Sequence, residues 1–220
     1  MDQFLKQRKQ IVENLEAMGY IKAPEVRRAM LKVKRELFVF KEYLKDAYLD
    51  VPLQIPGGAT ISAPHMHAIS LSALKLKPGD KVLEVGAGSG ILLAYMKKIV
   101  GDKGKVFGIE ITPETFEFAK KNLEKAGYSK KVKLILGDGS MGLPEDAPFD
   151  KILVSATAPD FPKPLIDQLK VGGIIISIIG PPSGHQELVY VEKAKEGKLI
   201  RKNLGGVVFV PLTGKYGWKK

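Results

Sequence analysis

From residue 80 onward, short apolar runs alternate with segments of helical periodicity. The apolar runs predict buried strands at residues 81–85, 105–109, 132–136, 149–155 and 173–179, and the segments between them predict helices at 90–100, 113–126 and 162–169. A chain that alternates in this way forms a parallel sheet with helices on both faces. Residues 188–210 predict two further strands that pair antiparallel. We therefore expect an α/β, doubly wound, Rossmann-like fold with a mostly parallel sheet.

The first 79 residues predict a helical extension to this sheet. Apolar residues recur at helical spacing between residues 2 and 18, and Gly19 ends that helix. A second helix begins near Pro24, a residue suited to a first turn. The Pro- and Gly-rich stretch at residues 48–64 predicts a long irregular loop, and such loops are often functional. We expect residues 1–79 and 80–220 to be two parts of one compact unit.

Composition limits the classes of function. The chain has no cysteine, which excludes disulfides, thiolate metal sites and a cysteine nucleophile. Lys and Arg number 35 against 24 Asp and Glu, a net charge of +11 that suits nucleic acid or acidic substrates. The alternative is a solvated lysine-rich surface, because the lysines are spread along the chain. No apolar run reaches the roughly 18 residues of a membrane span, and the N-terminus lacks a signal-peptide core. We expect a soluble, cytoplasmic protein that binds no membrane.

A glycine-rich turn follows the first strand of the repeating pattern. Residues 82–90 read Val-Leu-Glu-Val-Gly-Ala-Gly-Ser-Gly, and such glycines let the backbone turn tightly at the sheet edge where ligands bind. The dinucleotide fingerprint G-x-G-x-x-G would need glycine at position 91, where Ile91 stands. The spacing of Gly86, Gly88 and Gly90, with Glu84 two residues before them, instead resembles motif one of the S-adenosylmethionine methyltransferases. The alternative is a tight turn that binds no ligand.

Acidic residues end the next two strands. Glu110 lies 20 residues after Gly90, where a carboxylate can accept both ribose hydroxyls of a nucleoside and would repel a 2′-phosphate. Asp138 lies in Gly-Asp-Gly-Ser at residues 137–140 and resembles the methyltransferase residue that binds the adenine amino group. Either acid alone could be a solvated loop residue. Three such features at successive strand ends predict S-adenosyl-L-methionine as cofactor, with S-adenosyl-L-homocysteine as product.

The octapeptide at residues 60–67, Thr-Ile-Ser-Ala-Pro-His-Met-His, closely resembles the signature of the protein-L-isoaspartate (D-aspartate) O-methyltransferase family. Further segments resemble that family at residues 33–39, 47–53, 149–159, 169–173 and 210–214, so the resemblance covers about residues 5–217. The chain departs from the family pattern at Pro56, Ala59, Ala87 and Val171. None of these departures removes a reacting group.

The resemblance implies methyl transfer from S-adenosylmethionine to the carboxylate of L-isoaspartyl, and possibly D-aspartyl, residues in damaged proteins. The ester then closes to a succinimide, which hydrolyses partly to aspartate. Residues 80–220 would be the cofactor-binding methyltransferase domain, and residues 1–79 would supply the substrate loop. The expected cofactor residues are Ala59, Thr60, Ile61, His67, Glu84, Gly86, Gly88, Gly90, Glu110, Ile111, Asp138, Gly139, Ser140 and Thr213. The expected substrate residues are Ser62, Ala63, His65, Val210, Pro211 and Leu212, with Ser62 catalytic.

The chemistry needs few reacting groups. A carboxylate, with a pKa of about 4, is ionised at neutral pH and needs neither a general base nor a metal, so alignment carries much of the rate. The hydroxyl of Ser62 can hold one carboxylate oxygen while the other attacks; its alternative role is a helix N-cap. Ser62 is not in a G-x-S-x-G elbow, which disfavours a hydrolase triad with His65. His65 and His67 lack a third convergent ligand, so we expect no metal site.

Two other functions stay open at this point. A nucleic-acid methyltransferase of the same fold would suit the net charge, but residues 155–159 lack the stacking aromatic residue that such enzymes often carry. A non-catalytic binding module is the third possibility, because a fold does not guarantee activity. We expect the partners to be damaged proteins and peptides that contain isoaspartyl residues, with no specific nucleic acid, and we expect a monomer.

Overall fold

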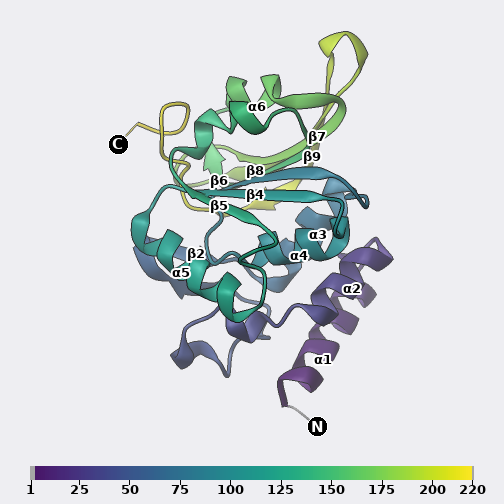
Figure 1. The fold of residues 1–220 in the computed structure, drawn as a ribbon, viewed down its shortest axis with the longest axis vertical. Helices are drawn as coiled ribbons and strands as arrows, with labels where there is room; N and C mark the ends of the chain where they lie inside the picture. The colour runs from purple at the N-terminus through teal and green to yellow at the C-terminus, as the bar shows by residue number, and fades with distance from the viewer. Residues whose placement is uncertain (1–2, 220) are drawn as a thin grey trace.

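The computed structural model describes residues 3–219 and contains a seven-stranded sheet with strand order β5-β4-β3-β6-β7-β8-β9 (Figure 1). The parallel strands are β3 (Lys81–Val85), β4 (Lys105–Glu110), β5 (Lys133–Leu136), β6 (Phe149–Ala158) and β7 (Leu169–Ile179). Strands β8 (Gln186–Lys193) and β9 (Leu199–Val207) continue the sheet antiparallel. The predicted α/β, mostly parallel, Rossmann-like fold is confirmed.

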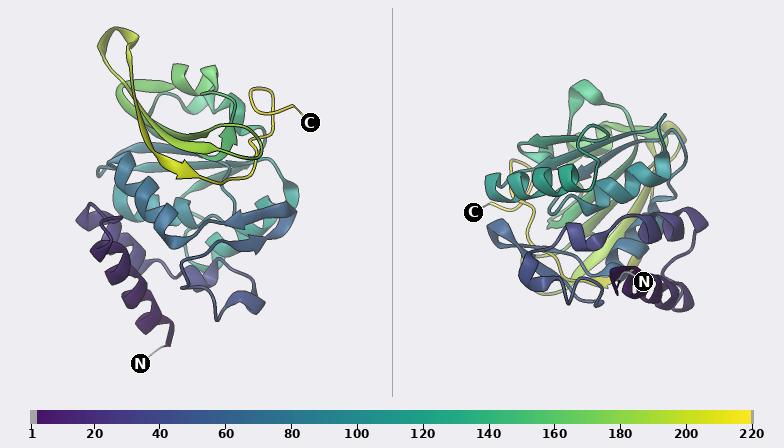
Figure 2. Two further views of the ribbon diagram at one scale, coloured as in Figure 1. Left: turned by 180° about the vertical axis from the view of Figure 1, so that it is seen from behind. Right: turned by 60° about the horizontal axis from the view of Figure 1, so that its bottom comes forward.

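Helices cover both faces of the sheet (Figure 2). On one side lie α3 (Pro64–Leu74), α4 (Ile91–Val100) and α5 (Pro113–Lys125), and the short helix α6 (Lys163–Asp167) lies on the other. The N-terminal extension consists of α1 (Gln3–Ala17) and α2 (Pro24–Lys32), which pack below α3 and α4. The N-terminal helix was predicted from residue 2, which lies outside the described residues.

The stretch predicted as irregular, residues 48–64, contains a small antiparallel hairpin. Strands β1 (Leu53–Ile55) and β2 (Ala59–Ile61) pair with Leu53 opposite Ile61, and the 3₁₀ turn Pro56–Gly58 joins them. Leu53, Ile55 and Ile61 point into the core, which holds the hairpin in place. Gly57 has a φ of 77°, and a Cβ there would collide with the side chain of Thr115 on α5. Only glycine therefore allows this close approach of the hairpin to α5.

Further boundaries differ from the prediction, among them the start of β7, at Leu169 rather than at residue 173. Helix α6 ends at Asp167 rather than at residue 169, because Leu169 already pairs with Phe149 as the first residue of β7. Strand β6 continues past residue 155 to Ala158, where an irregularity in its pairing with β7 shifts the register. The backbone of these extra β6 residues forms hydrogen bonds that hold the C-terminal segment. The predicted C-terminal strand pair is present as β8 and β9.

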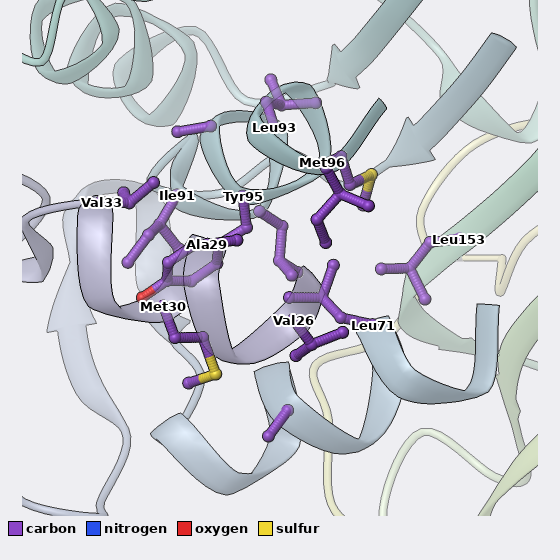
Figure 3. Packing of buried hydrophobic residues seen from close by; sticks show 14 of the residues in the cluster. Val26, Ala29, Met30, Val33, Leu71, Ile91, Leu93, Tyr95, Met96 and Leu153 are labelled. Atoms are coloured by element: carbon purple, nitrogen blue, oxygen red, sulfur yellow. The ribbon is translucent and has the colours of Figure 1, made fainter. Parts of the chain in front are cut away.

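The extension and the sheet share one hydrophobic cluster. Val26 and Met30 of α2 pack with Leu71 of α3, Tyr95 of α4 and Leu153 of β6 (Figure 3). A second cluster fills the opposite face of the sheet, under α6. Residues from both predicted parts, 1–79 and 80–220, belong to this shared cluster. The division of the chain into these parts stays a prediction. Among residues 3–219, no helix is long and apolar enough to cross a membrane.

Candidate active site

The glycine-rich turn lies at the carboxyl end of β3, as predicted. Gly86, Gly88 and Gly90 have φ values of 82°, 54° and 84°, a region that favours glycine. The N–H groups of Gly86 and Ala87 both donate to the carbonyl of Ile109, at 2.9 and 3.0 Å, which fixes the turn to the end of β4. Gly86 and Gly88 line the main cavity of the protein.

Gly90 was predicted to contact the cofactor, but it lies outside the residues that line the cavity. A Cβ at this position would lie only 3.1 Å from the side chain of Leu123, on α5. Gly90 therefore serves the close packing of the turn against α5. Packing against α5 requires a glycine at position 90. The sequence motif alone cannot tell a glycine required by packing from one required by contact with a ligand.

Glu110 ends β4 and is 7% exposed in the cavity. Its Oε2 accepts a hydrogen bond from the Gly88 N–H at 3.0 Å, and its Oε1 accepts from the Ile111 and Thr112 N–H groups at 2.9 and 3.0 Å. A carboxylate offers about four acceptor sites, so roughly one remains, on Oε2. While these three bonds are kept, Glu110 has room for one ribose hydroxyl rather than the two that the sequence predicted.

Glu84 is a buried carboxyl group at the floor of the same cavity, only 1% exposed. The Ser155 hydroxyl donates to its Oε1 at 3.1 Å, and its Oε2 has no hydrogen-bond partner within residues 3–219. Burial raises the pKa of Glu84 well above its usual value; the charge of Glu110 adds to this rise, and the Ser155 hydrogen bond opposes it. An unsatisfied buried acceptor is costly unless a ligand supplies a donor.

Asp138 and Ser140 were also predicted to bind the cofactor, but neither lines the cavity. Asp138 accepts bonds from the Ser140 N–H and hydroxyl at 2.9 and 2.7 Å and from the Lys215 N–H at 2.8 Å. Burial alone would raise the pKa of Asp138, but these hydrogen bonds outweigh it and lower the pKa. The pair therefore holds the C-terminal segment in place. Gly139, between them, was also predicted to bind the cofactor, and it does line the cavity.

The main cavity, of about 570 Å³, brings together residues from six segments of the chain, within 52–67, 84–92, 109–112, 139, 155–156 and 206–213. The predicted residues that line it are Ala59, Thr60, Ile61, Ser62, Ala63, His65, His67, Glu84, Gly86, Gly88, Glu110, Ile111, Gly139, Val210, Pro211, Leu212 and Thr213. The sequence analysis did not assign to the site several other residues that line the cavity, namely Gly57, Gly58, Ala87, Ser155, Val207, Val208 and Phe209. Val208 is 85% exposed, so the cavity has an apolar rim beside the predicted substrate wall.

Ser62 lies between β2 and α3, half-buried in the cavity wall. The N-cap of α3 is Ala63, followed by Pro64 at the first helical turn, and no side chain caps this helix. The alternative role of Ser62 as the N-cap is therefore wrong, because the N-cap lies one residue later in the chain. Within residues 3–219, the Ser62 hydroxyl makes no hydrogen bond, so it can bind a ligand without giving up a structural contact.

The two histidines of the octapeptide have different partners. Both the backbone N–H and Nδ1 of His65 lie 2.9 Å from Oδ1 of Asp50, and both histidines line the cavity. His67 is buried, and its Nδ1 lies 3.3 Å from NH1 of Arg35. Among the described residues, no three His, Asp or Glu side chains converge in a group that could hold a metal.

A second hollow of about 390 Å³ adjoins the cavity, with which it shares Ile111, Thr112 and Thr213. Trp218 lines it, and the backbone N–H of Trp218 donates to the Leu212 carbonyl at 2.8 Å. The indole Nε1 of Trp218 is buried without a hydrogen-bond partner among the described residues. The sequence analysis missed Trp218, because only the folding back of the C-terminal segment brings it to the site.

The family model for protein-L-isoaspartate(D-aspartate) O-methyltransferase matches residues 6–217. The chain belongs to this family. Proteins named protein-L-isoaspartate O-methyltransferase from Pyrococcus horikoshii and Hyperthermus butylicus are 53% and 50% identical to it, over 96% and 99% of this chain and 95% and 92% of their own lengths. The family that the octapeptide predicted is confirmed.

A solved structure supports the same assignment. The protein-L-isoaspartate O-methyltransferase from Plasmodium falciparum, in complex with S-adenosyl-L-homocysteine, superposes with a TM-score of 0.84 at 32% identity. The match covers 94% of this chain and 98% of that one. The cavity of this family member fits such a cofactor, because the unpartnered Oε2 of Glu84 is a buried acceptor suited to the ammonium group of an amino acid. S-adenosylmethionine is the cofactor of this family.

The raised pKa of Glu84 predicts a pH-dependent stability difference for Glu84→Gln. At pH values below about 4.5 the carboxyl group is protonated in both states, so the variant and the parent should have similar stability. As the pH rises toward the folded-state pKa, only the unfolded carboxyl ionises, and the parent loses about 1.4 kcal/mol per pH unit relative to the variant. Thermal melts from pH 4 to 8 should show this widening gap. Glu124→Gln, at an exposed position of α5, is the matched control and should show none.

The same variant should bind S-adenosylhomocysteine more weakly, because a glutamine amide lacks the negative charge that attracts an ammonium group. Calorimetry at neutral pH measures this loss. A Glu84→Gln protein that is no more stable than the parent at pH 8 would show that Glu84 is not an uncompensated buried acid.

Proposed function

We propose that this chain methylates the carboxylate of L-isoaspartyl residues, and also of D-aspartyl residues, in damaged proteins. The observation that carries the proposal is the position of Ser62: its unpartnered hydroxyl lies in the same cavity as the glycine turn, Glu84 and Glu110. The hydroxyl group faces a space that a cofactor and a substrate carboxylate would share. The family match and the named relatives support the same reaction.

The glycine turn, Glu84 and Glu110 hold the cofactor in this proposal. Gly86 and Gly88 let the backbone approach it closely, Glu110 accepts one ribose hydroxyl, and Glu84 accepts the amino group. When bound, S-adenosylmethionine supplies a methyl carbon activated by its positively charged sulfur. The apolar side chain of Ile111 and the indole of Trp218 form the walls of the second hollow, which would take the adenine.

The substrate enters over the rim formed by residues 207–212. Ser62 donates its hydroxyl hydrogen to one oxygen of the substrate carboxylate and leaves the other oxygen free to bond to the methyl carbon. The carboxylate is already ionised at neutral pH, so no side chain has to remove a proton. The contribution of Ser62 is alignment, which counts most when the reacting atoms are in line. His65, fixed by Asp50, contacts the substrate from the same wall.

Three finer statements stay predictions. The protein acts as a monomer, in the cytoplasm, and without a specific nucleic-acid partner. A cytoplasmic site would suit a chain without cysteine, since disulfides are rare there. The reaction needs no metal ion, because neither the carboxylate nor the methyl group requires activation by one.

Replacing Ser62 with Ala should slow turnover more than it weakens cofactor binding. The loss of one hydrogen bond to a charged group corresponds to roughly 1.5–3 kcal/mol, or about a ten- to 150-fold lower rate. Single-turnover methylation of an isoaspartyl peptide measures the rate, and calorimetry with S-adenosylhomocysteine measures the binding. Stability should hardly change, because Ser62 caps no helix.

Ser72→Ala, on the following helix α3, is the matched control. The Ser72 hydroxyl donates to the Tyr20 carbonyl and accepts from the Lys22 N–H, so this variant should melt earlier and turn over normally. If Ser62→Ala methylates at the parent rate, the role proposed for Ser62 is wrong, and backbone N–H groups must hold the carboxylate.

Trp218 makes cofactor binding visible, because it is the single tryptophan of the chain. Titration with S-adenosylhomocysteine or with adenosine should change its fluorescence, whereas methionine should not. Trp218→Ala should weaken binding by about 1–3 kcal/mol, the usual contribution of base stacking on an aromatic ring. Fluorescence that stays constant while calorimetry detects binding would place the adenine elsewhere.

A further inference from the structure

Arg35 is a buried cation without an anion. It lies in the 3₁₀ turn Arg35–Leu37, and its side chain is 1% exposed. Its Nε donates to the Ala47 carbonyl at 2.7 Å, its NH1 lies 3.3 Å from Nδ1 of His67, and its NH2 has no partner among the described residues. Within residues 3–219, no carboxylate lies within ion-pair distance of it; the neighbouring buried Arg8 is paired with Glu36.

The charge of Arg35 persists at neutral pH. Burial lowers the pKa of Arg35 to about 10, and the nearby Tyr95, Tyr48 and Asp50 oppose this fall. Burying an uncompensated charge is expensive. A protein that keeps such a group close to its main cavity has a site of positive potential there, because no carboxylate within residues 3–219 forms an ion pair with it.

The contact with Arg35 fixes the state of His67. A guanidinium group can only donate hydrogen bonds, so Nδ1 of His67 must accept, and the proton of the neutral ring lies on Nε2. Burial, with the charges of Arg35 and His65, lowers the pKa of His67 well below its usual value, so the ring stays neutral. Tyr95 packs against the ring edge from α4, with ring centroids 5.9 Å apart. His67 lines the cavity, and Nε2–H is the donor left for a ligand.

We propose that Arg35 is a positioning residue, which presents the Nε2–H of His67 to the carboxylate at the amino-acid end of the cofactor. The inference rests on the proposed use of S-adenosylmethionine. The amino-acid end is a zwitterion, and the cavity has two uncompensated buried groups that match it: Glu84 for the ammonium and the Arg35–His67 pair for the carboxylate. The negative charge of the bound carboxylate also offsets the buried charge of Arg35.

The test compares two ligands that differ only at the amino-acid end. S-adenosylhomocysteine carries this end, whereas 5′-methylthioadenosine keeps the nucleoside and the sulfur but lacks the zwitterion. In calorimetry, Arg35→Met should bind S-adenosylhomocysteine about ten- to 150-fold more weakly than the parent and bind methylthioadenosine equally well. Arg35→Lys, which keeps the charge but not the planar fork, should show a smaller loss.

Arg8→Met is the matched control, because Arg8 is a buried arginine whose hydrogen bonds go to Tyr48, Leu31 and Glu36 and not to His67. Its Nε donates to the Tyr48 hydroxyl at 2.7 Å and its NH2 to Glu36 at 2.7 Å, so this variant should melt earlier. Its preference between the two ligands should match that of the parent. Equal losses for both ligands in Arg35→Met, or a loss for neither, would overturn the proposal.

The pH dependence adds a result that a purely structural role would not give. Removing the charge of Arg35 should raise the pKa of His67, so the ring in Arg35→Met protonates as the pH falls. The imidazolium then attracts the carboxylate, and affinity for S-adenosylhomocysteine should recover at low pH in the variant but not in the parent. The neighbouring groups that also face Arg35 or His67, namely His65, Tyr95, Tyr48 and Asp50, are the same in both proteins.

Nitrogen NMR of the parent decides the tautomer without any variant. The chain has three histidines, so the ring nitrogens are few enough to assign. A neutral His67 with its proton on Nε2 is expected, and a proton on Nδ1 would overturn the proposal even if Arg35→Met failed to fold. A parent that bound no S-adenosylhomocysteine would refute the proposed function, while the tautomer would still test the contact with Arg35.

Discussion

The Glu110 carboxylate joins the parts of the site. Through Oε2 it accepts the Gly88 N–H of the glycine turn, and through Oε1 it accepts the N–H groups of Ile111 and Thr112 before α5. Helix α5 then holds the substrate side, because the Thr115 hydroxyl donates to the Pro56 carbonyl at 2.8 Å. That bond positions the β1–β2 hairpin, and Ser62 follows directly after β2. Cofactor loop and substrate loop are thus linked through one carboxylate and one helix.

A buried carboxyl group, Glu84, lines the cavity, and a buried guanidinium, that of Arg35, contacts the cavity residue His67. Within residues 3–219, Glu84 forms no ion pair with a cation and Arg35 forms none with a carboxylate, although each is only 1% exposed. Buried groups without a partner destabilise the free protein, and in natural proteins such destabilising groups occur mainly at functional sites. The net charge of +11, which kept a nucleic-acid substrate open, says nothing of this arrangement, because charge summed over the chain does not locate a charge. In the proposed mode of binding, the positions of Glu84 and of the Arg35–His67 pair decide the fit to a zwitterion.

The sheet and much of the cavity could be predicted because their signals are local. Buried parallel strands are apolar throughout, and a glycine turn after such a strand is visible in the sequence. The β1–β2 hairpin was missed because its strands have three residues each and Pro56 and Gly57 resemble a loop. Buried residues at alternate positions, Leu53, Ile55 and Ile61, were the available signal.

The predicted residues that lie outside the cavity, and the residues that were missed, make contacts between distant segments of the chain. Gly90 faces Leu123 of α5, and Asp138 binds the backbone of Lys215, 77 residues further along the chain. Neither contact leaves a periodic or motif-like trace. The same holds for Trp218, which the C-terminal segment brings to the second hollow, and for Arg35, whose contact with His67 spans 32 residues. A motif identifies residue types, whereas the fold decides which of them face the ligand.

Selectivity between two peptides that differ only in one linkage tests the central claim most directly. The measurement is methyl transfer from labelled S-adenosylmethionine to an isoaspartyl peptide, beside the same peptide with a normal aspartyl residue. We predict label in the isoaspartyl peptide and none above background in its aspartyl twin, with the product labile to base as a methyl ester. Equal labelling of both peptides, or labelling of neither by a protein that binds S-adenosylhomocysteine, would contradict the assignment of this cavity to isoaspartyl repair.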